Sequence, residues 1–93
     1  MKSGAYLINT SRGPVLNEAD VADALKSGRL AGAGVDVLSA EPAREDNPLL
    51  TCDKCIITPH IAWASFEARD LCIDEVILNI KAFKNGSPRN SVN

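Results

Sequence analysis

Four side chains with catalytic potential stand at or just beyond the ends of short apolar segments: Arg12, Asp36, Glu41 and His60. A guanidinium binds a carboxylate with two hydrogen bonds, and an imidazole gives or takes a proton near neutral pH. Glu41, if it reaches His60, would orient the ring and favour its charged form, while Asp36 could accept a hydrogen bond from a ligand amide. This set suits the reduction of a 2-oxo acid, in which the carboxylate is held, the carbonyl oxygen is protonated and a cofactor supplies the hydride.

Each of the four residues also has an ordinary structural interpretation. An arginine after a strand is commonly a solvated surface charge, and a histidine after Thr-Pro is commonly a turn residue. Asp36 fits a turn cap, and Glu41, which precedes Pro42, fits a side chain that faces water. A catalytic interpretation is favoured only if all four side chains converge on one edge of a sheet.

The residues on either side of Arg12 predict a strand–helix–strand unit. Ala5–Ile8 is apolar without a helical stripe and ends in polar residues, which indicates a short strand. Asn17 is a good N-cap for a helix that Gly28 closes. Leu30–Leu38 is a continuous run of small apolar residues, which predicts a strand covered on both faces, and its glycines predict the close approach of another backbone.

A third strand is predicted over Cys55–Thr58, after a loop at residues 39–53 that is rich in Pro, Asp and Asn. That loop is long enough to return the chain for a second parallel pairing. Because ligands bind outside the carboxyl ends of parallel strands, the four candidate side chains would share one edge. A long helix is predicted from the N-cap Ser65 to about Lys84, apolar on more than one side.

Composition narrows the class of protein. Apolar residues make up 45% of the 93-residue chain, charged residues make up 24%, and the net charge is −2. These values are typical of a soluble globular protein and leave no basic face for nucleic acid. No apolar stretch has the length of a membrane span. Three cysteines are an odd number and too few for a disulfide scaffold, so a cytoplasmic location is expected.

Two rival sites use other residues. Cys52 and Cys55 have a C-x-x-C spacing, but a structural zinc needs four ligands, and Cys72 lies inside the long predicted helix. We therefore expect no metal site and interpret the pair as chance neighbours in a loop. Hydrolysis by Ser11, His60 and Asp36 would need the strained G-x-S-x-G turn, which the sequence lacks.

Three motifs occur in order along the chain, namely LINTSRG, AGAGVDVLSAEP and ITPHIAWAS. Their sequence, order and approximate spacing resemble the C-terminal motifs of the D-isomer-specific 2-hydroxyacid dehydrogenases. The likeness extends to NPLL before the third strand and to NIKAFKNGSPRNSVN at the end. The HIAW form of the third motif is similar to glycerate dehydrogenases, also called hydroxypyruvate reductases. A phosphoglycerate dehydrogenase-like enzyme, which more often has glycines there, is the alternative.

The resemblance implies a catalytic Arg, Glu, His set, with NAD or NADP as the cofactor of the full-length parent. Arg12 would bind the carboxylate and carbonyl of a small 2-oxo or 2-hydroxy acid, Glu41 would pair with the histidine, and His60 would be the general acid and base. Asp36 would hold the nicotinamide carboxamide. The implied cofactor-binding residues are Thr10, Arg12, Asp36, Ala62 and Trp63.

Family members are several times longer, and their phosphate-binding loop, ribose-binding acid and substrate domain precede LINTSRG. We therefore expect an α/β fragment of a Rossmann-like parallel sheet, with three strands and one crossover helix, plus a long C-terminal helix. Residues 1–63 would be the C-terminal part of an NAD-binding domain, and residues 64–93 would pack on the missing substrate domain. Alone, the chain is expected to bind no cofactor usefully, to be inactive and to self-associate through its sheet edge and long helix. The alternative is a non-catalytic interaction or regulatory fragment.

Overall fold

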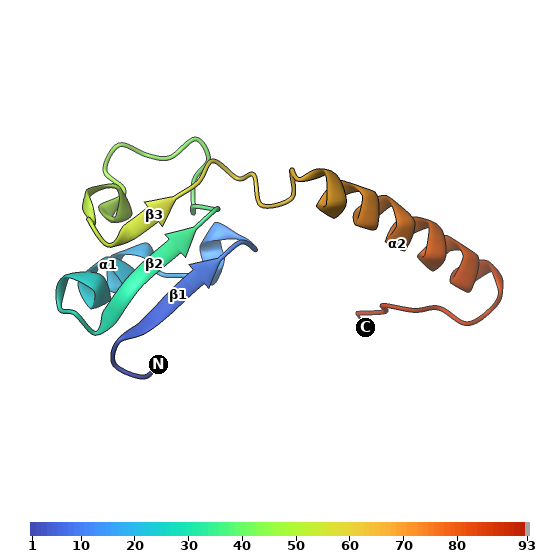
Figure 1. Ribbon diagram of the computed structural model, residues 1–93, viewed down its shortest axis with the longest axis horizontal. Coiled ribbons are helices and arrows are strands. Elements are labelled where there is room, and N and C mark those ends of the chain that lie inside the picture. The colour runs from blue at the N-terminus through green and yellow to red at the C-terminus, as the bar shows by residue number, and fades with distance from the viewer. Residues whose placement is uncertain (93) are drawn as a thin grey trace. The chain divides into compact units, whose positions relative to one another are not determined.

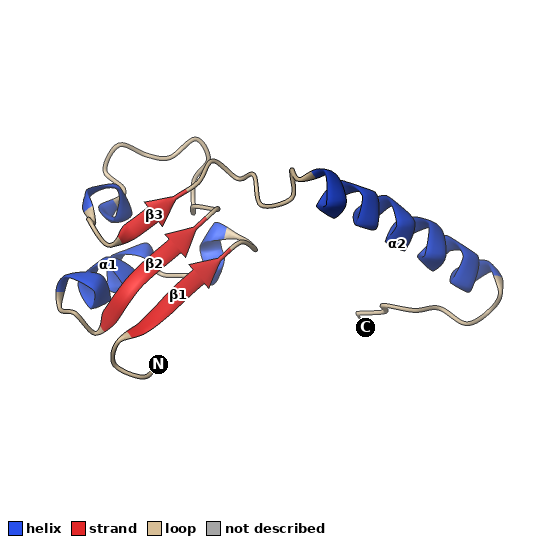
Figure 2. Cartoon of the chain, viewed as in Figure 1, coloured by secondary structure: helices blue, strands red, loops and turns tan. Residues whose placement is uncertain are grey.

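The computed structural model describes residues 1–92 and divides the chain into two compact units, Met1–Ala62 and Trp63–Asn93. The boundary predicted from the sequence, after residue 63, lies one residue further along. Asn93, the last residue of the predicted second segment, lies outside the described residues. Strands occur in the first unit, and the second unit contains one long helix (Figure 2).

The first unit contains a parallel sheet with the strand order β1-β2-β3 (Figure 1). Its strands are β1 (Ala5–Asn9), β2 (Leu30–Val35) and β3 (Cys55–Ile57). Asn9 of β1 lies opposite Val35 of β2, and Val35 in turn lies opposite Ile57 of β3. The three strands therefore end side by side at one edge, and the predicted parallel α/β fold is confirmed.

Helix α1 (Glu18–Lys26) connects β1 to β2, and the predicted N-cap is confirmed. The Asn17 side chain accepts a hydrogen bond from the backbone N–H of Ala19 at 3.1 Å. After the helix, Gly28 adopts a φ of 75°, a conformation that glycine takes without steric cost. The buried core lies between α1, the sheet and the loop before β3, and its members are Leu7, Val21, Ala22, Leu25, Leu30, Ala33, Val35, Leu38, Leu49 and Cys52.

The segment at residues 39–53, predicted as a plain loop, contains a short 3-10 helix, η2 (Pro48–Thr51). Asn47 precedes it, and its side chain accepts a hydrogen bond from Leu49 N–H at 3.0 Å. This turn places Leu49, which is 1% exposed, in the core. Leu49 of NPLL is therefore a core contribution that the loop prediction missed, because a single turn is too short to show helical periodicity, whereas Leu50 is exposed.

The prediction that β2 is covered on both faces agrees with its burial, since all its residues are buried or half-buried, whereas one face of β1 and of β3 is exposed. Tyr6, Ile8 and Ile56 are 71–75% exposed, whereas Leu7, which points the opposite way on β1, is buried. Gly32 lies against both a side chain and a neighbouring backbone. A Cβ atom on Gly32 would lie 3.0 Å from the Tyr6 ring and 3.4 Å from the backbone carbonyl oxygen of Lys54.

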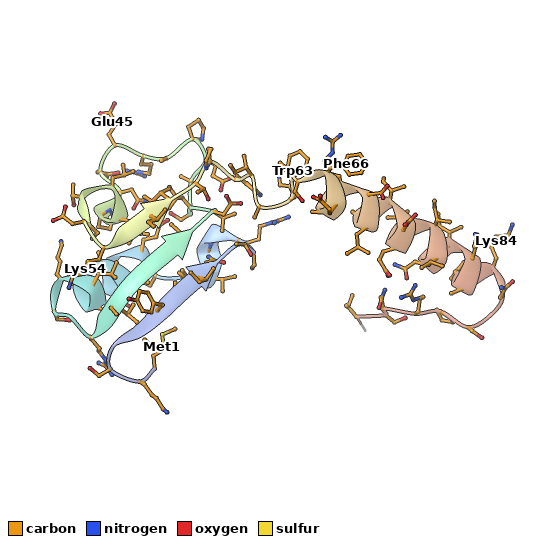
Figure 3. All side chains as sticks on the ribbon, viewed as in Figure 1. Met1, Glu45, Lys54, Trp63, Phe66 and Lys84 are labelled. Carbon is orange, nitrogen blue, oxygen red and sulfur yellow. The ribbon has the colours of Figure 1, made fainter. Side chains whose placement is uncertain are left out.

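The second unit consists of helix α2 (Phe66–Lys84) and a short tail. Ser65 is the N-cap, as predicted, and its Oγ accepts a hydrogen bond from Ala68 N–H at 3.1 Å. The tail returns to the helix through an ion pair between Arg89 and Glu75, with Nη2 and Oε2 3.1 Å apart. Figure 3 shows side chains projecting all along α2, between its labelled ends.

No residue of α2 is buried within the described part of the chain, so the burial expected on more than one side of this helix is not seen there. Its exposed large apolar residues are Phe66, Leu71, Ile73, Val76, Ile77, Leu78, Ile80 and Phe83. Among residues 1–92, no helix combines the length and apolar character that crossing a membrane requires.

Candidate active site

Backbone hydrogen bonds tie together the segments that leave the carboxyl ends of the strands. The N–H of Asp36 donates to the carbonyl of Asn9 at 2.9 Å, and the N–H of Thr58 donates to the carbonyl of Val35 at 3.0 Å. Each segment is thus anchored to the end of the neighbouring strand. The side chains that follow β2 and β3 start from one edge of the sheet, as the parallel topology predicts.

The contact expected between Glu41 and His60 is present. Glu41 Oε2 and His60 Nδ1 are 2.7 Å apart, and both side chains are about two-fifths exposed. Glu41 Oε1 accepts a hydrogen bond from Leu38 N–H at 3.1 Å, which fixes the carboxylate. The hydrogen bond from His60, that amide, and the positive charges of His60 and Arg12 hold the pKa of Glu41 below its usual value of 4.5. Glu41 is therefore an anion that orients the ring through Nδ1.

Asp36 holds the turn that carries His60. It is 4% exposed, and its carboxylate accepts hydrogen bonds from the Thr58 hydroxyl at 2.5 Å and from the N–H groups of Ile61 at 2.9 Å and Ala62 at 2.8 Å. The Thr58 hydroxyl, followed by these amides and the charge of His60, lowers the pKa of Asp36 from its usual 3.8. Within this turn His60 adopts a φ of 55°, which is uncommon for a residue with a side chain.

The same contacts bear on whether Asp36 can also hold a cofactor amide. A carboxylate offers roughly four acceptor positions, of which three are used here. The remaining capacity fits one N–H of a nicotinamide carboxamide. The acceptor position left on Asp36 is therefore compatible with that part of a nicotinamide cofactor, while its other positions hold the turn around His60.

Arg12 is presented by a turn that Asn9 builds. The Asn9 amide is 6% exposed, and it accepts a hydrogen bond from Ser11 N–H at 3.1 Å and donates one to the Arg12 carbonyl at 3.0 Å. The exposed guanidinium donates to the Ser11 carbonyl at 2.7 Å. Sequence reasoning missed Asn9, although a polar amide that ends an apolar strand was a visible signal.

A cavity of about 480 Å³ opens beside the histidine. Its lining residues are Asp36, Leu38, Glu41, Pro42, Ala43, Ile57, Thr58, Pro59 and His60. Arg12 is not among the described residues that line it, although its charge acts on Glu41. The structure therefore brings aspartate, glutamate and histidine together at one cavity and keeps the guanidinium outside its wall.

For three other predicted cofactor residues, the structure gives their exposure and place in the chain. Thr10 is exposed and immediately follows β1, and Ala62 is exposed with its N–H directed to Asp36. Trp63 is 60% exposed and is the first residue of the second unit. Their contacts with a cofactor stay predictions.

The cysteine pair does not have the features of a reactive site. Cys52 is buried, and its thiol lies 3.3 Å from the Pro48 carbonyl. Burial, and then the neighbouring Cys52, raises the pKa of Cys55, which disfavours the thiolate. Residues 1–92 contain no group of three or more His, Cys, Asp or Glu side chains arranged to hold a metal ion.

Comparison with known proteins gives these residues a context. Residues 1–62 match the sequence profile described as "D-isomer specific 2-hydroxyacid dehydrogenase, NAD binding domain". A hydroxypyruvate reductase from Blautia hydrogenotrophica is 52% identical over the whole chain and 29% of its own length. A glycerate dehydrogenase from Methylorubrum extorquens is 46% identical over 99% of the chain and 30% of its own length. The chain thus spans less than a third of these curated relatives.

Solved structures show the same similarity. An acyclic imino acid reductase in complex with NADPH and D-Arg matches all of the chain and 29% of its own, with a TM-score of 0.73 and 38% identity. A D-isomer specific 2-hydroxyacid dehydrogenase from Xanthobacter autotrophicus, in complex with NADPH and MES, matches all of the chain and 38% of its own, with a TM-score of 0.73 and 35% identity.

Proposed function

The chain belongs to the D-isomer specific 2-hydroxyacid dehydrogenase family, and we propose that it supplies the Arg, Glu, His part of the active site of an NAD(P)-dependent glycerate dehydrogenase, or hydroxypyruvate reductase. The reaction is hydride transfer between a nicotinamide and a small 2-oxo or 2-hydroxy acid. The observation that carries the proposal is the 2.7 Å hydrogen bond between Glu41 and His60, beside a cavity that both residues line.

His60 is the general acid and base in this proposal. In the direction of reduction, the charged ring gives its Nε2 proton to the substrate carbonyl oxygen as the carbon is reduced. The neutral ring keeps its Nδ1 proton, which it donates to Glu41 in a hydrogen bond. When bound, the reduced nicotinamide supplies the hydride. Glu41 stabilises the charged ring before the transfer and holds the ring orientation after it, because its carboxylate stays ionised.

Arg12 holds the substrate carboxylate in this proposal, since a guanidinium can make two parallel hydrogen bonds to it. Asp36 has acceptor capacity for the nicotinamide carboxamide, with Thr10, Ala62 and Trp63 along the cofactor. The net charge of −2 supports a small-molecule partner rather than nucleic acid. The three free cysteines support a cytoplasmic location.

A chimera tests the proposal. Residues 1–93 replace the matching 29% of the Blautia enzyme, and NADH oxidation is measured with hydroxypyruvate and with glyoxylate. The chimera is expected to prefer hydroxypyruvate, and His60→Gln is expected to lower kcat/KM by about 10²–10⁴, the usual contribution of a general acid. Glu41→Gln should also lower it, whereas Glu45→Gln, an exposed residue of the same loop, should not (Figure 3). Full activity of the His60→Gln chimera would refute the proposal.

The 93-residue chain alone is proposed to bind NADH weakly and to be inactive, because these residues do not include the phosphate-binding loop that the family resemblance implies. Calorimetric titration is expected to detect no binding of NADH at micromolar concentration. We also propose that the chain self-associates, since α2 has no buried residue and the sheet exposes Tyr6, Ile8 and Ile56.

A further inference from the structure

Glu18 makes a two-point contact with the loop that carries Glu41. It is the first residue of α1, and its carboxylate accepts hydrogen bonds from Ser39 N–H at 2.8 Å and from the Ser39 hydroxyl at 2.6 Å. Hydrogen bonds to an ionised carboxylate are among the stronger ones in proteins. Partial burial raises the pKa of Glu18, but the bonds from Ser39 and from the Asn47 side chain outweigh it and lower the pKa below 4.5.

Next to this contact, the backbones of the two loops touch. A Cβ atom on Gly13 would lie 2.0 Å from the carbonyl carbon and oxygen of Leu38, so only glycine fits there. Gly13 directly follows Arg12, and Leu38 directly precedes Ser39. The segment that presents Arg12 and the segment that leads to Glu41 are therefore packed face to face and joined by Glu18.

Two consecutive backbone amides donate hydrogen bonds to two different carboxylates. The N–H of Leu38 donates to Glu41, and the N–H of Ser39 donates to Glu18. Glu41 and Glu18 thus hold two consecutive peptide units of one backbone segment. Glu41 in turn contacts His60 at Nδ1.

We propose that Glu18 is a positioning residue that acts through Ser39: it fixes the Leu38–Ser39 amides, hence the Glu41 carboxylate and hence the orientation and tautomer of His60. Its catalytic meaning rests on the proposed function, but the positioning itself is a property of residues 1–62. An N-terminal acidic residue can also simply stabilise its helix. Asp20, in the same first turn of α1, supplies that effect and serves as the matched control.

His60 is the only histidine in the chain, so its ring can be observed without overlap. The ¹⁵N shifts of the neutral ring in the 93-residue protein report the fraction of the Nε2–H tautomer, and Glu41→Ala sets the baseline for a ring without this carboxylate. Glu18→Ala is expected to raise the ratio of the Nε2–H to the Nδ1–H tautomer by about fivefold, the change in an equilibrium constant that a typical net hydrogen bond supports. Asp20→Ala is expected to leave it unchanged.

Ser39→Ala gives a second measurement, because it removes the hydroxyl bond and keeps the amide bond to Glu18. It is expected to give a smaller shift in the same direction, and it carries the test if Glu18→Ala does not fold. The proposal is overturned if the folded variants, Glu18→Ala or Ser39→Ala, keep the parent's tautomer fraction. If Glu41→Ala itself changes nothing, Glu41 does not orient His60, and the proposed function loses its support as well. The two failures are therefore distinguishable.

Discussion

The two units of this chain place their apolar side chains in opposite surroundings. In Met1–Ala62, Leu49 and Val35 are 1% and 2% exposed and belong to a core shared by the sheet, α1 and η2. In Trp63–Asn93, Phe66 and Phe83 at the two ends of α2 are 79% and 76% exposed. The first unit has tertiary structure of its own, whereas the second depends on helix hydrogen bonds, a cap and a short tail.

This difference separates two sources of stability. Burial of apolar surface contributes about 25 cal/mol per Å², so the first unit can hold polar side chains such as Asp36 and Asn9 in fixed positions. An isolated helix is marginally stable in water, and its apolar side chains contribute only when something covers them. We therefore expect core mutations to lower the free energy of unfolding of the unit with the candidate site. Mutations in α2 should mainly change self-association.

The largest expected effect is in the core. Leu49→Ala should lower the free energy of unfolding by about 2–5 kcal/mol, because it leaves a cavity among well-packed side chains. Leu78→Ala, the same change at an exposed position of α2, should change it by about 0.5 kcal/mol or less. Urea denaturation followed by circular dichroism measures both. Equal losses from the two variants would contradict the comparison.

The next effect is on association. Ile73→Glu in α2 should weaken self-association by about tenfold or more, because a charge replaces an apolar side chain whose burial contributes about 2 kcal/mol. Ser87→Glu adds the same charge beyond the helix and should have little effect. Sedimentation at several concentrations measures both variants. A parent chain that stays monomeric at every concentration would contradict the expectation that the apolar side chains of α2 drive self-association.

Acid should weaken the first unit through its depressed carboxyl groups. Glu18, Asp36 and Glu41 have pKa values below the usual 4.5 for Glu and 3.8 for Asp, so the folded form binds their protons less readily than the unfolded chain. Their stabilisation is present above these usual values and is lost as the pH falls through the folded pKa values. The urea midpoint should therefore fall with acid below about pH 4.5, and less steeply in Glu18→Gln. An identical slope in that variant would refute the assignment to Glu18.

The smallest expected effect is at the helix caps. Ser65→Ala removes the acceptor for Ala68 N–H and should cost about 1 kcal/mol of local helix stability. Amide hydrogen exchange in the first turn of α2 should accelerate accordingly, while Ser87→Ala should leave it unchanged. Asn17→Ala should produce a similar loss in α1, with part of the exchange protection retained because α1 packs on the core.

Several features of the site were predictable because their signals are local. The N-caps Asn17 and Ser65 and the positions of the three strands follow from neighbouring residue types, although β2 ends at Val35, before the predicted Leu38. Parallel strands in one sheet predicted that Glu41 and His60 share an edge, and the family resemblance implied that they pair. The apolar run of β2 predicted its burial correctly, since none of its residues is exposed, but such a run does not report which elements cover the strand.

From the sequence alone came the order of the elements, their parallel arrangement and the edge at which the candidate side chains gather, because these depend on short-range pattern and on the chirality of strand–helix–strand connections. Only the tertiary structure decided that Gly13 touches Leu38, that Glu18 holds Ser39 and that Asp36 anchors the turn around His60. Those contacts join residues 21 to 25 positions apart, and which polar groups meet across such loops is settled by packing, on which the local sequence carries no information.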